Sequence, residues 1–369
     1  MLTGHATREG TATYRQRFAG TCAATHFRPA ADLWLSSIGL GTYLGDADEH
    51  TDSLYTDAIV RAVALGCNVL DTAINYRHQR SECAIGQALT TCIHDGTVSR
   101  DEIVVATKGG YIAFDGTVPP DPRAYVHSTF IATGLATPDD IVDWNCLAPR
   151  YIDAQVEQSL RNLGLESVDI YYLHNPEAQL QKRTRQDFYK QLEETLTILE
   201  GKVAAGKICG YGTATWNGYR QAPTARDVLF FSDLIEIAER VGGKQHHFKF
   251  VQLPYNFAMM EALTQRNQRN GKAMVSFLEI AHNYGITVMA SASILQGRLA
   301  HQLPAAIGDS LNGLHSDAQR AIQFTRSTPG ITTALVGMKS IAHVEHNLEL
   351  TKVPPASFEQ LQKLFRDRS

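Results

Sequence analysis

The chain has 369 residues, of which 44% are hydrophobic and 20% charged, and its formal net charge is −4. This ordinary globular composition excludes a disordered or collagen-like chain. The near balance of charge excludes the strongly basic face that nucleic-acid binding needs. The longest stretch free of charged side chains, 281–297, contains several polar residues and is shorter than the ~20 apolar residues of a membrane span.

The cysteines and the N-terminal residues indicate the cellular compartment in which we expect the protein. None of the six cysteines forms a C-x-x-C pair, and a chain of this length needs no disulfides to stabilise its core. The N-terminal residues lack the apolar segment of a secretory signal. We therefore expect reduced thiols in a cytoplasmic protein, with disulfides as the alternative.

Taken in chain order, residues 1–26 are polar and without periodicity, which predicts a flexible, loosely held extension. Short β-branched runs then alternate with segments of helical period. The strands are expected at 37–41, 68–71, 103–107, 169–174, 208–213, 250–252, 287–290 and 332–336. Helices are expected between most of them, including 56–65, 82–91, 151–163, 188–205 and 275–284.

Eight alternating units favour one fold over another. Strand–helix alternation indicates a parallel sheet, and eight repeats at this length favour a closed (β/α)₈ TIM barrel spanning 27–369 as a single domain. An open dinucleotide-binding sheet would need G-x-G-x-x-G after its first strand. The glycines there, Gly39, Gly41 and Gly45, miss that spacing by one residue.

Two long connections follow predicted strands. Residues 111–149 contain turn signals together with five large aromatic side chains, and 296–315 follow the seventh strand. Loops of this length in compact domains are usually functional. Because βα connections lie on the catalytic face of a barrel, we expect both to overhang an active site. A final helix is expected at about 355–367.

Polar residues end several apolar strands. Asp71, Lys108 and His174 stand at the carboxyl ends of the second, third and fourth strands, and Tyr76 lies in the loop after Asp71. In a barrel this position favours a catalytic role. A tyrosine whose pKa is lowered by a nearby ammonium, with Asp71 holding Lys108 and His174 bonding a substrate oxygen, suits protonation of a carbonyl as a hydride arrives at carbon. Taken singly, each residue has a structural interpretation, as a cap, packing or core residue.

The sequence resembles the aldo-keto reductase superfamily. The resemblance rests on the segment from Asn68 to Tyr76, with Asp and Tyr five residues apart, and on motifs in order at 81–89, 101–108, 159–164, 168–174, 202–212, 328–330 and 337–347. It covers about 27–350. It implies an NAD(P)H-dependent carbonyl reductase on a (β/α)₈ barrel, with Tyr76 as acid/base supported by Asp71, Lys108 and His174.

The resemblance also implies a cofactor site that uses no glycine-rich fingerprint. Gly337 begins the motif of this site. Lys339 and Ser340 would meet the 2′-phosphate of NADPH at the start of a helix, with NADH bound more weakly, and Asn347 would contact adenine. Gln252 matches the residue that binds the nicotinamide carboxamide. A solvated lysine beside a capping serine is the structural alternative for Lys339 and Ser340.

The chain departs from the family pattern in three places. Ala214-Thr215 replaces the Ser-Asn pair that holds the carboxamide, so Thr215 and Gln252 are expected to rebuild that contact. Ser291 stands where an aromatic usually stacks on the nicotinamide, and His343 stands where Gln or Arg is frequent. No metal site is expected, since His343 and His346 lack an assured third ligand.

The leading hypothesis is a reductase of an aldehyde or ketone, acting on a small molecule and not on nucleic acid or membrane. The substrate pocket is expected to include Tyr43, Tyr111, Trp144 and Asn175. Two alternatives stay open: an accessory, cofactor-binding barrel similar to potassium-channel β subunits, and an isomerase or dehydratase on the same barrel. The oligomeric state is not indicated by the sequence.

Overall fold

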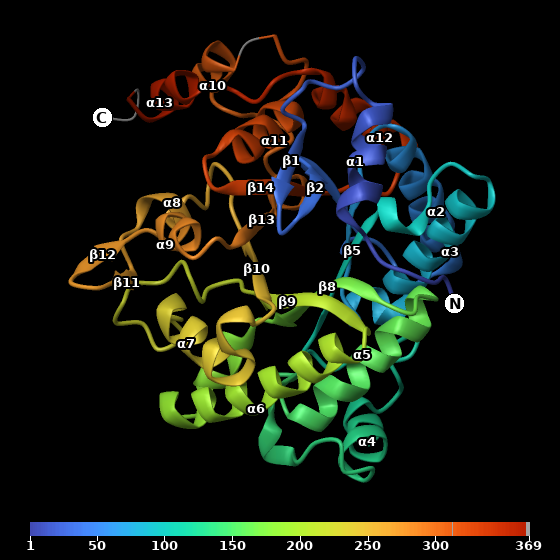
Figure 1. Ribbon diagram of the computed structural model, residues 1–369, viewed down its shortest axis with the longest axis vertical. Helices are drawn as coiled ribbons and strands as arrows, with labels where there is room; N and C mark the ends of the chain where they lie inside the picture. The colour runs from blue at the N-terminus through green and yellow to red at the C-terminus, as the bar shows by residue number, and fades with distance from the viewer. Residues whose placement is uncertain (312, 367–369) are drawn as a thin grey trace.

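Eight parallel strands close into a barrel in the computed structural model, which describes residues 1–311 and 313–366 (Figure 1). Their order around the barrel is β10-β13-β14-β3-β4-β5-β8-β9, and pairing of β9 with β10 completes the ring. All eight predicted strands are confirmed, with ends that differ by at most two residues. They are β3 (Ile38–Gly41), β4 (Val69–Asp71), β5 (Val104–Gly109), β8 (Val168–His174), β9 (Ile208–Ala214), β10 (Phe248–Pro254), β13 (Thr287–Ser291) and β14 (Ile331–Gly337).

Helices cover the outside of the barrel, and their ends follow local signals. Asp48 caps α2 by accepting a hydrogen bond from the Thr51 N–H at 2.7 Å. Pro149 begins α5, and Gly164, at a φ of 65°, ends it. The main helices are α2 (Glu49–Ala64), α3 (Arg80–His94), α5 (Pro149–Leu163), α6 (Arg185–Ala204), α7 (Phe231–Gly242), α9 (Phe277–Asn283), α11 (Asp317–Ser327) and α12 (Ile341–Leu348).

Two sets of buried side chains fill the molecule. One packs inside the barrel and includes Val104, Ile170, Phe250 and Met289. The larger one packs between the strands and the surrounding helices. Because apolar side chains occupy the barrel interior, polar chemistry is left to its ends.

The N-terminal segment is held against the barrel and is not the loosely held extension expected from its polar sequence. It forms α1 (Arg8–Arg17) and leads into a hairpin of β1 (Phe27–Ala30) and β2 (Leu33–Ser36). Tyr14 is fully buried and donates to the Val63 carbonyl at 2.5 Å. The Ala6 N–H donates to Asp169 Oδ1 at 2.6 Å. A few isolated contacts of this kind leave no hydrophobic periodicity in the sequence.

The long connections begin at the catalytic ends of β5 and β13, as predicted. Most of 111–149 then folds back beside α5 and does not cover the barrel mouth: it forms α4 (Pro122–Val126), which is drawn below α5 in Figure 1. Phe130 packs on Tyr151 of α5 with ring centroids 5.2 Å apart. A short hairpin of β6 (Ile141–Val142) and β7 (Asn145–Cys146) ends the insertion.

The remaining elements lie outside the barrel. The connection after β13 contains α10 (Ala305–Ser310), which lies against α11 and α13 (Phe358–Arg366) (Figure 1). The helix expected near 355–367 is therefore present, and position 367 lies outside the described residues. An unforeseen hairpin pairs β11 (Gln268–Asn270) with β12 (Ala273–Val275).

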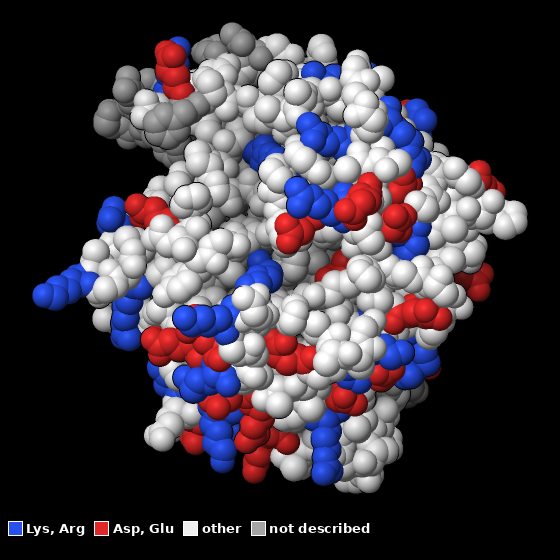
Figure 2. All heavy atoms as spheres, viewed as in Figure 1, with Lys and Arg blue, Asp and Glu red and all other residues white. Residues whose placement is uncertain are grey.

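Charge is distributed without a dominant sign. Acidic and basic side chains are interspersed on the face shown in Figure 2, which agrees with the net charge of −4. Within 1–311 and 313–366, no helix combines the length and apolar character needed to cross a bilayer.

Candidate active site

A cavity of about 450 Å³ lies at the carboxyl ends of the barrel strands. This is the end at which barrel enzymes place their chemistry. The residues that line it come from loops after most of the strands. They include Tyr43, Asp71, Asn75, Tyr76, Tyr111, His174, Asn175, Thr215, Trp216, Gln252, Ser291, Ile294, Gln296 and Gly337.

An ion pair forms the floor of this cavity. Lys108 is fully buried, and its Nζ donates to Asp71 Oδ1 and to the Thr72 carbonyl, both at 2.7 Å. Burial lowers the pKa of Lys108 and raises that of Asp71, while each charge opposes the shift of its partner. Strands β4 and β5 are neighbours in the sheet, so their polar ends meet as the sequence predicted.

Tyr76 lies directly over this pair. Lys108 Nζ is 4.8 Å from the centroid of the Tyr76 ring. Burial, followed by the charge of Asp71, raises the pKa of Tyr76 well above its ordinary value. The lowering that the sequence predicted is not found, because burial and the negative charge of Asp71 both raise this pKa. Tyr76 is therefore a phenol that holds its proton in this structure.

His174 stands beside Tyr76 at the end of β8, with the ring centroids 5.8 Å apart. Burial lowers the pKa of His174 well below its ordinary value, and the charge of Lys108 lowers it further. The imidazole is therefore neutral at pH 7. Its Nδ1 is buried without a hydrogen-bond partner in the described part of the chain.

The backbone after Tyr76 turns through three left-handed residues, Arg77, His78 and Gln79, with φ between 49° and 76°. Arg77 holds this turn: its guanidinium is buried, donates to the Asp46 carbonyl at 2.8 Å and pairs with Asp52. The conformation costs about 1–3 kcal/mol for each such residue and needs support from its surroundings. This turn could not be predicted from the sequence, where only an arginine next to the tyrosine hints at it.

Three residues expected near the nicotinamide line the cavity: Thr215, Gln252 and Ser291. Gln252 donates to Asp71 Oδ2 at 2.6 Å, a contact the sequence did not predict. The hydroxyl of Thr215 is buried and has no partner among the described residues. An orphaned hydroxyl at this place fits a ligand that brings its own hydrogen-bonding group.

Glu177 fixes the loop that carries Thr215. Its Oε1 accepts three successive backbone N–H groups, from Trp216 and Asn217 at 2.9 Å and from Gly218 at 3.1 Å. Glu177 is buried, and burial raises its pKa. These three hydrogen bonds hold the loop after β9 in one conformation, and sequence reasoning missed Glu177.

The residues expected at the adenosine end follow β14. Gly337 lines the cavity, whereas Lys339, Ser340 and Asn347 lie beyond it. Ser340 caps α12 by accepting from the His343 N–H at 3.3 Å, and Asn347 is buried on the same helix. Lys339 is exposed and reaches toward the loop after β3. An exposed lysine beside a helix N-terminus is chemistry suited to a phosphate group.

Three of the four residues that were predicted to contact the substrate line the cavity. Tyr43, Tyr111 and Asn175 line the cavity, and Asn175 Nδ2 donates to the Tyr111 hydroxyl at 3.2 Å. Trp144 does not line it: its side chain is 43% exposed and packs against Phe114 outside the barrel. Asp143 and Trp144 both have positive φ in the β6–β7 turn, which directs the indole away.

Trp216 lines the cavity and was missed, although it directly follows Ala214-Thr215 at a strand end.

Comparison with known proteins agrees with this arrangement. The model of the Aldo/keto reductase family matches residues 37–365. The chain belongs to this family. The barrel, and the cavity at the carboxyl ends of its strands, are therefore those of an aldo/keto reductase.

Individual relatives differ in how much they cover. The NADH-specific methylglyoxal reductase of Escherichia coli (strain K12) is 29% identical over 191 residues, 50% of this chain and 49% of that protein. The chain thus spans about half the length of the first curated relatives it matches. The L-glyceraldehyde 3-phosphate reductase of Escherichia coli O157:H7 is 23% identical over 365 residues, 89% and 87% of the two chains.

Solved aldo/keto reductases share the fold. A Klebsiella pneumoniae enzyme in complex with NADP and acetate superimposes with a TM-score of 0.62 at 21% identity, covering 93% of this chain and 95% of that one. The holo form of a Bacillus halodurans enzyme gives a TM-score of 0.63 at 20% identity, covering 93% and 96%.

Proposed function

We propose that this aldo/keto reductase reduces an aldehyde or ketone to an alcohol, with NADPH as hydride donor and Tyr76 as proton donor. One observation carries the proposal. Tyr76 and His174 face the same cavity above a buried Lys108–Asp71 ion pair. Family membership supports carbonyl reduction in general, and the geometry supports the division of roles among these four residues.

Each of the four side chains has its own role in the proposed reaction. NADPH, when bound, supplies the hydride to the carbonyl carbon. The neutral imidazole of His174 binds and orients the carbonyl oxygen, and the Tyr76 hydroxyl gives that oxygen a proton. Lys108 lies beneath the Tyr76 ring, so its charge stabilises the phenolate as it forms. Asp71 holds Lys108 in place.

The same proposal assigns the cofactor contacts. Thr215, Gln252 and Ser291 would hold the nicotinamide end, because they line the cavity from the ends of the neighbouring strands β9, β10 and β13. Lys339 and Ser340 would bind the 2′-phosphate, and Asn347 the adenine. These residues favour NADPH over NADH, although one relative is described as NADH-specific. Six free cysteines support a reducing, cytoplasmic setting.

The test is steady-state oxidation of NADPH with a panel of aldehydes and ketones. We expect turnover with at least one carbonyl, and a fall of about 10²-fold or more in Tyr76→Phe with unchanged cofactor affinity. Tyr76→Phe keeps the ring and removes only the proton donor. Near wild-type turnover in this variant would show that Tyr76 is not the proton donor. Cofactor binding without any turnover would favour an accessory barrel instead.

A further inference from the structure

Asn145 stands between the two strands that carry the cavity wall. It is fully buried in β7, at the end of the 111–149 insertion. Its Nδ2 donates to the backbone carbonyl of His174 at 2.8 Å. Its backbone bridges to Tyr111, and the next residue, Cys146, donates to the Gly110 carbonyl at 2.6 Å. One hairpin residue therefore touches the ends of both β5 and β8.

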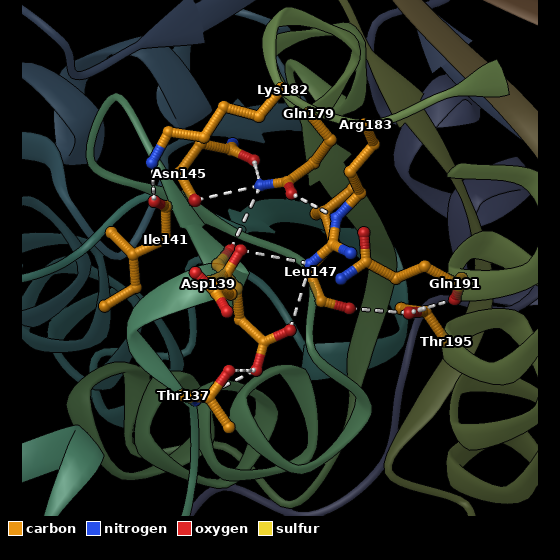
Figure 3. Close-up of polar contacts among 11 residues, drawn as sticks. Thr137, Asp139, Ile141, Asn145, Leu147, Gln179, Lys182, Arg183, Gln191 and Thr195 are labelled. Carbon is orange, nitrogen blue, oxygen red and sulfur yellow. Dashed lines mark hydrogen bonds and ion pairs between the residues drawn. The ribbon is translucent and has the colours of Figure 1, made fainter. Parts of the chain in front are cut away.

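A second buried amide holds Asn145 from the other side. Gln179 is fully buried, and its Nε2 donates to both the Oδ1 and the backbone carbonyl of Asn145 at 2.9 Å. Gln179 Oε1 accepts from Arg183 Nε at 3.1 Å, and Arg183 pairs with Asp140 at 3.0 Å. Figure 3 shows Gln179 between Asn145 and Arg183. The hairpin is thereby joined to the loop after β8.

The network leaves Asn145 no freedom to change its contacts. Its amide donates on one side and accepts on the other, so a flipped amide would face an N–H with an N–H and a carbonyl with an oxygen. Beyond it, Tyr111 and His174 pack edge to face with centroids 5.0 Å apart. These two rings form one wall of the cavity. Their placement depends on the two strand ends that Asn145 connects.

We propose that Asn145 is a positioning residue for the Tyr111–His174 wall. In this proposal the β6–β7 hairpin, which we call the clamp, holds the ends of β5 and β8 together behind the active site. The inference rests on the proposed function, because it assigns the hairpin a role in carbonyl binding. It also gives the insertion a role that does not require it to cover the cavity. A displacement of about 1 Å in a substrate-orienting group can cost about 10²-fold in rate.

The test compares three variants for carbonyl KM, kcat, NADPH affinity and thermal midpoint. Asn145→Asp keeps the acceptor for Gln179 and turns an oxygen toward the His174 carbonyl in place of the N–H. Gln179→Met keeps the Asn145–His174 bond and removes its support. Lys182→Met is the control, since exposed Lys182 reaches the same hairpin only at the Ile141 carbonyl, 3.5 Å away.

We expect KM for the carbonyl to rise about tenfold or more in Asn145→Asp, with a smaller rise in Gln179→Met and none in the control. NADPH affinity should stay within about twofold of wild type, because the cofactor residues lie on other strands. If Asn145→Asp does not fold, Gln179→Met decides. A folded variant with unchanged KM and kcat, or one that loses cofactor and carbonyl binding together, would overturn the proposal.

A second readout separates this proposal from the proposed function. The imidazole resonances of His174, assigned with His174→Gln, should shift or broaden in Asn145→Asp and stay unchanged in Lys182→Met. This holds even if the wild type turns over no carbonyl, a result that would count against the reductase and not against the clamp. Unchanged His174 resonances in Asn145→Asp would contradict the clamp directly.

Discussion

Gln252 Nε2 donates a hydrogen bond of 2.6 Å to Asp71 Oδ2, while Asp71 Oδ1 accepts from Lys108. The residue expected at the nicotinamide thus also holds the carboxylate beneath Tyr76. Strand β10 is joined across the barrel to β4 by this bond. In the proposed function, the cofactor end and the proton-transfer end of the site therefore share the side chain of Gln252.

This sharing predicts a double effect for Gln252→Met. The variant removes both the proposed contact with the cofactor and the donor to Asp71, so NADPH should bind more weakly and kcat should fall. Hydrogen bonds to charged groups are worth ~1.5–3 kcal/mol, which corresponds to about tenfold or more for each effect. Fluorescence titration and single-turnover kinetics measure the two separately.

Ser291→Ala is the matched control. Ser291 lines the same cavity on the next strand. Among the described residues, the side chains that donate to Asp71 are Lys108 and Gln252. Ser291→Ala should weaken cofactor binding and leave kcat nearly unchanged. Equal effects of the two variants on kcat would mean that the bond from Gln252 to Asp71 has no part in proton transfer.

Lys108→Met should destabilise the protein as well as inactivate it. The change leaves Asp71 as a buried carboxylate without its cation, which costs about 3–5 kcal/mol in the free energy of unfolding. Chemical denaturation measures that loss. The pKa of Asp71 should rise further, because the lowering effect of Lys108 has gone.

The double variant Lys108→Met, Asp71→Asn separates stability from catalysis. Removing both charges should restore most of the stability and none of the activity, since the phenolate of Tyr76 still lacks its cation. Recovery of turnover in the double variant would show that Lys108 acts only on folding.

The convergence of Asp71, Lys108 and His174 could be predicted because it follows from topology. Carboxyl ends of neighbouring parallel strands meet at one end of a barrel, whatever the details of the loops. The strands themselves were predictable from alternating apolar runs. Gln252 could be placed in the cavity for the same reason, although its bond to Asp71 could not.

Loop geometry could not be predicted in this way. Trp144 was expected in the cavity, but left-handed backbone at Asp143 and Trp144 turns it outward, while Trp216 lines the cavity instead. Asp adopts positive φ more readily than most residues, but the pattern of side chains does not indicate that a tryptophan such as Trp144 will do so. The elevated pKa of Tyr76 depends on burial and on the charge left after pairing, which are properties of the assembled site.

Lys339→Ala should weaken NADPH and leave NADH nearly unchanged. A charge-assisted bond to the 2′-phosphate is worth ~1.5–3 kcal/mol, or about 10- to 150-fold in affinity. Because Lys339 is exposed, solvent screening favours about tenfold. Dissociation constants for both cofactors decide the matter, with Lys352→Ala as an exposed-lysine control. Equal losses of affinity for NADPH and NADH would show that Lys339 supports the fold and does not bind the 2′-phosphate.

His26 predicts how stability depends on pH. Burial lowers the pKa of His26 to about 4. Its Nε2–H donates to the Gly66 carbonyl at 2.9 Å, so its Nδ1 accepts from the Ser37 hydroxyl at 3.0 Å. The folded protein thus holds a neutral imidazole, whereas the unfolded chain binds a proton below about pH 6.5. His26 therefore makes its full contribution to the free energy of unfolding above that pH, and this contribution is lost as the pH falls toward 4.

The size of this loss can be measured by denaturation at several pH values. A shift from 6.5 to about 4 limits the contribution of His26 to about 3 kcal/mol. His26→Asn removes the titration, so its stability should fall less steeply between pH 6.5 and 4 than that of the wild type. His174 titrates in both proteins and cancels from the comparison. Identical slopes would show that His26 is accessible to protons in the folded state.

Transfer of deuterium to a carbonyl substrate from NADPH that carries deuterium at both C4 positions tests the central claim most directly. Mass spectrometry of the alcohol formed by the wild type should find one deuterium on the former carbonyl carbon, and Tyr76→Phe should form this product about 10²-fold more slowly while binding NADPH equally well. An enzyme that binds NADPH but transfers deuterium to no carbonyl, or a Tyr76→Phe variant that transfers it at the wild-type rate, would contradict the account.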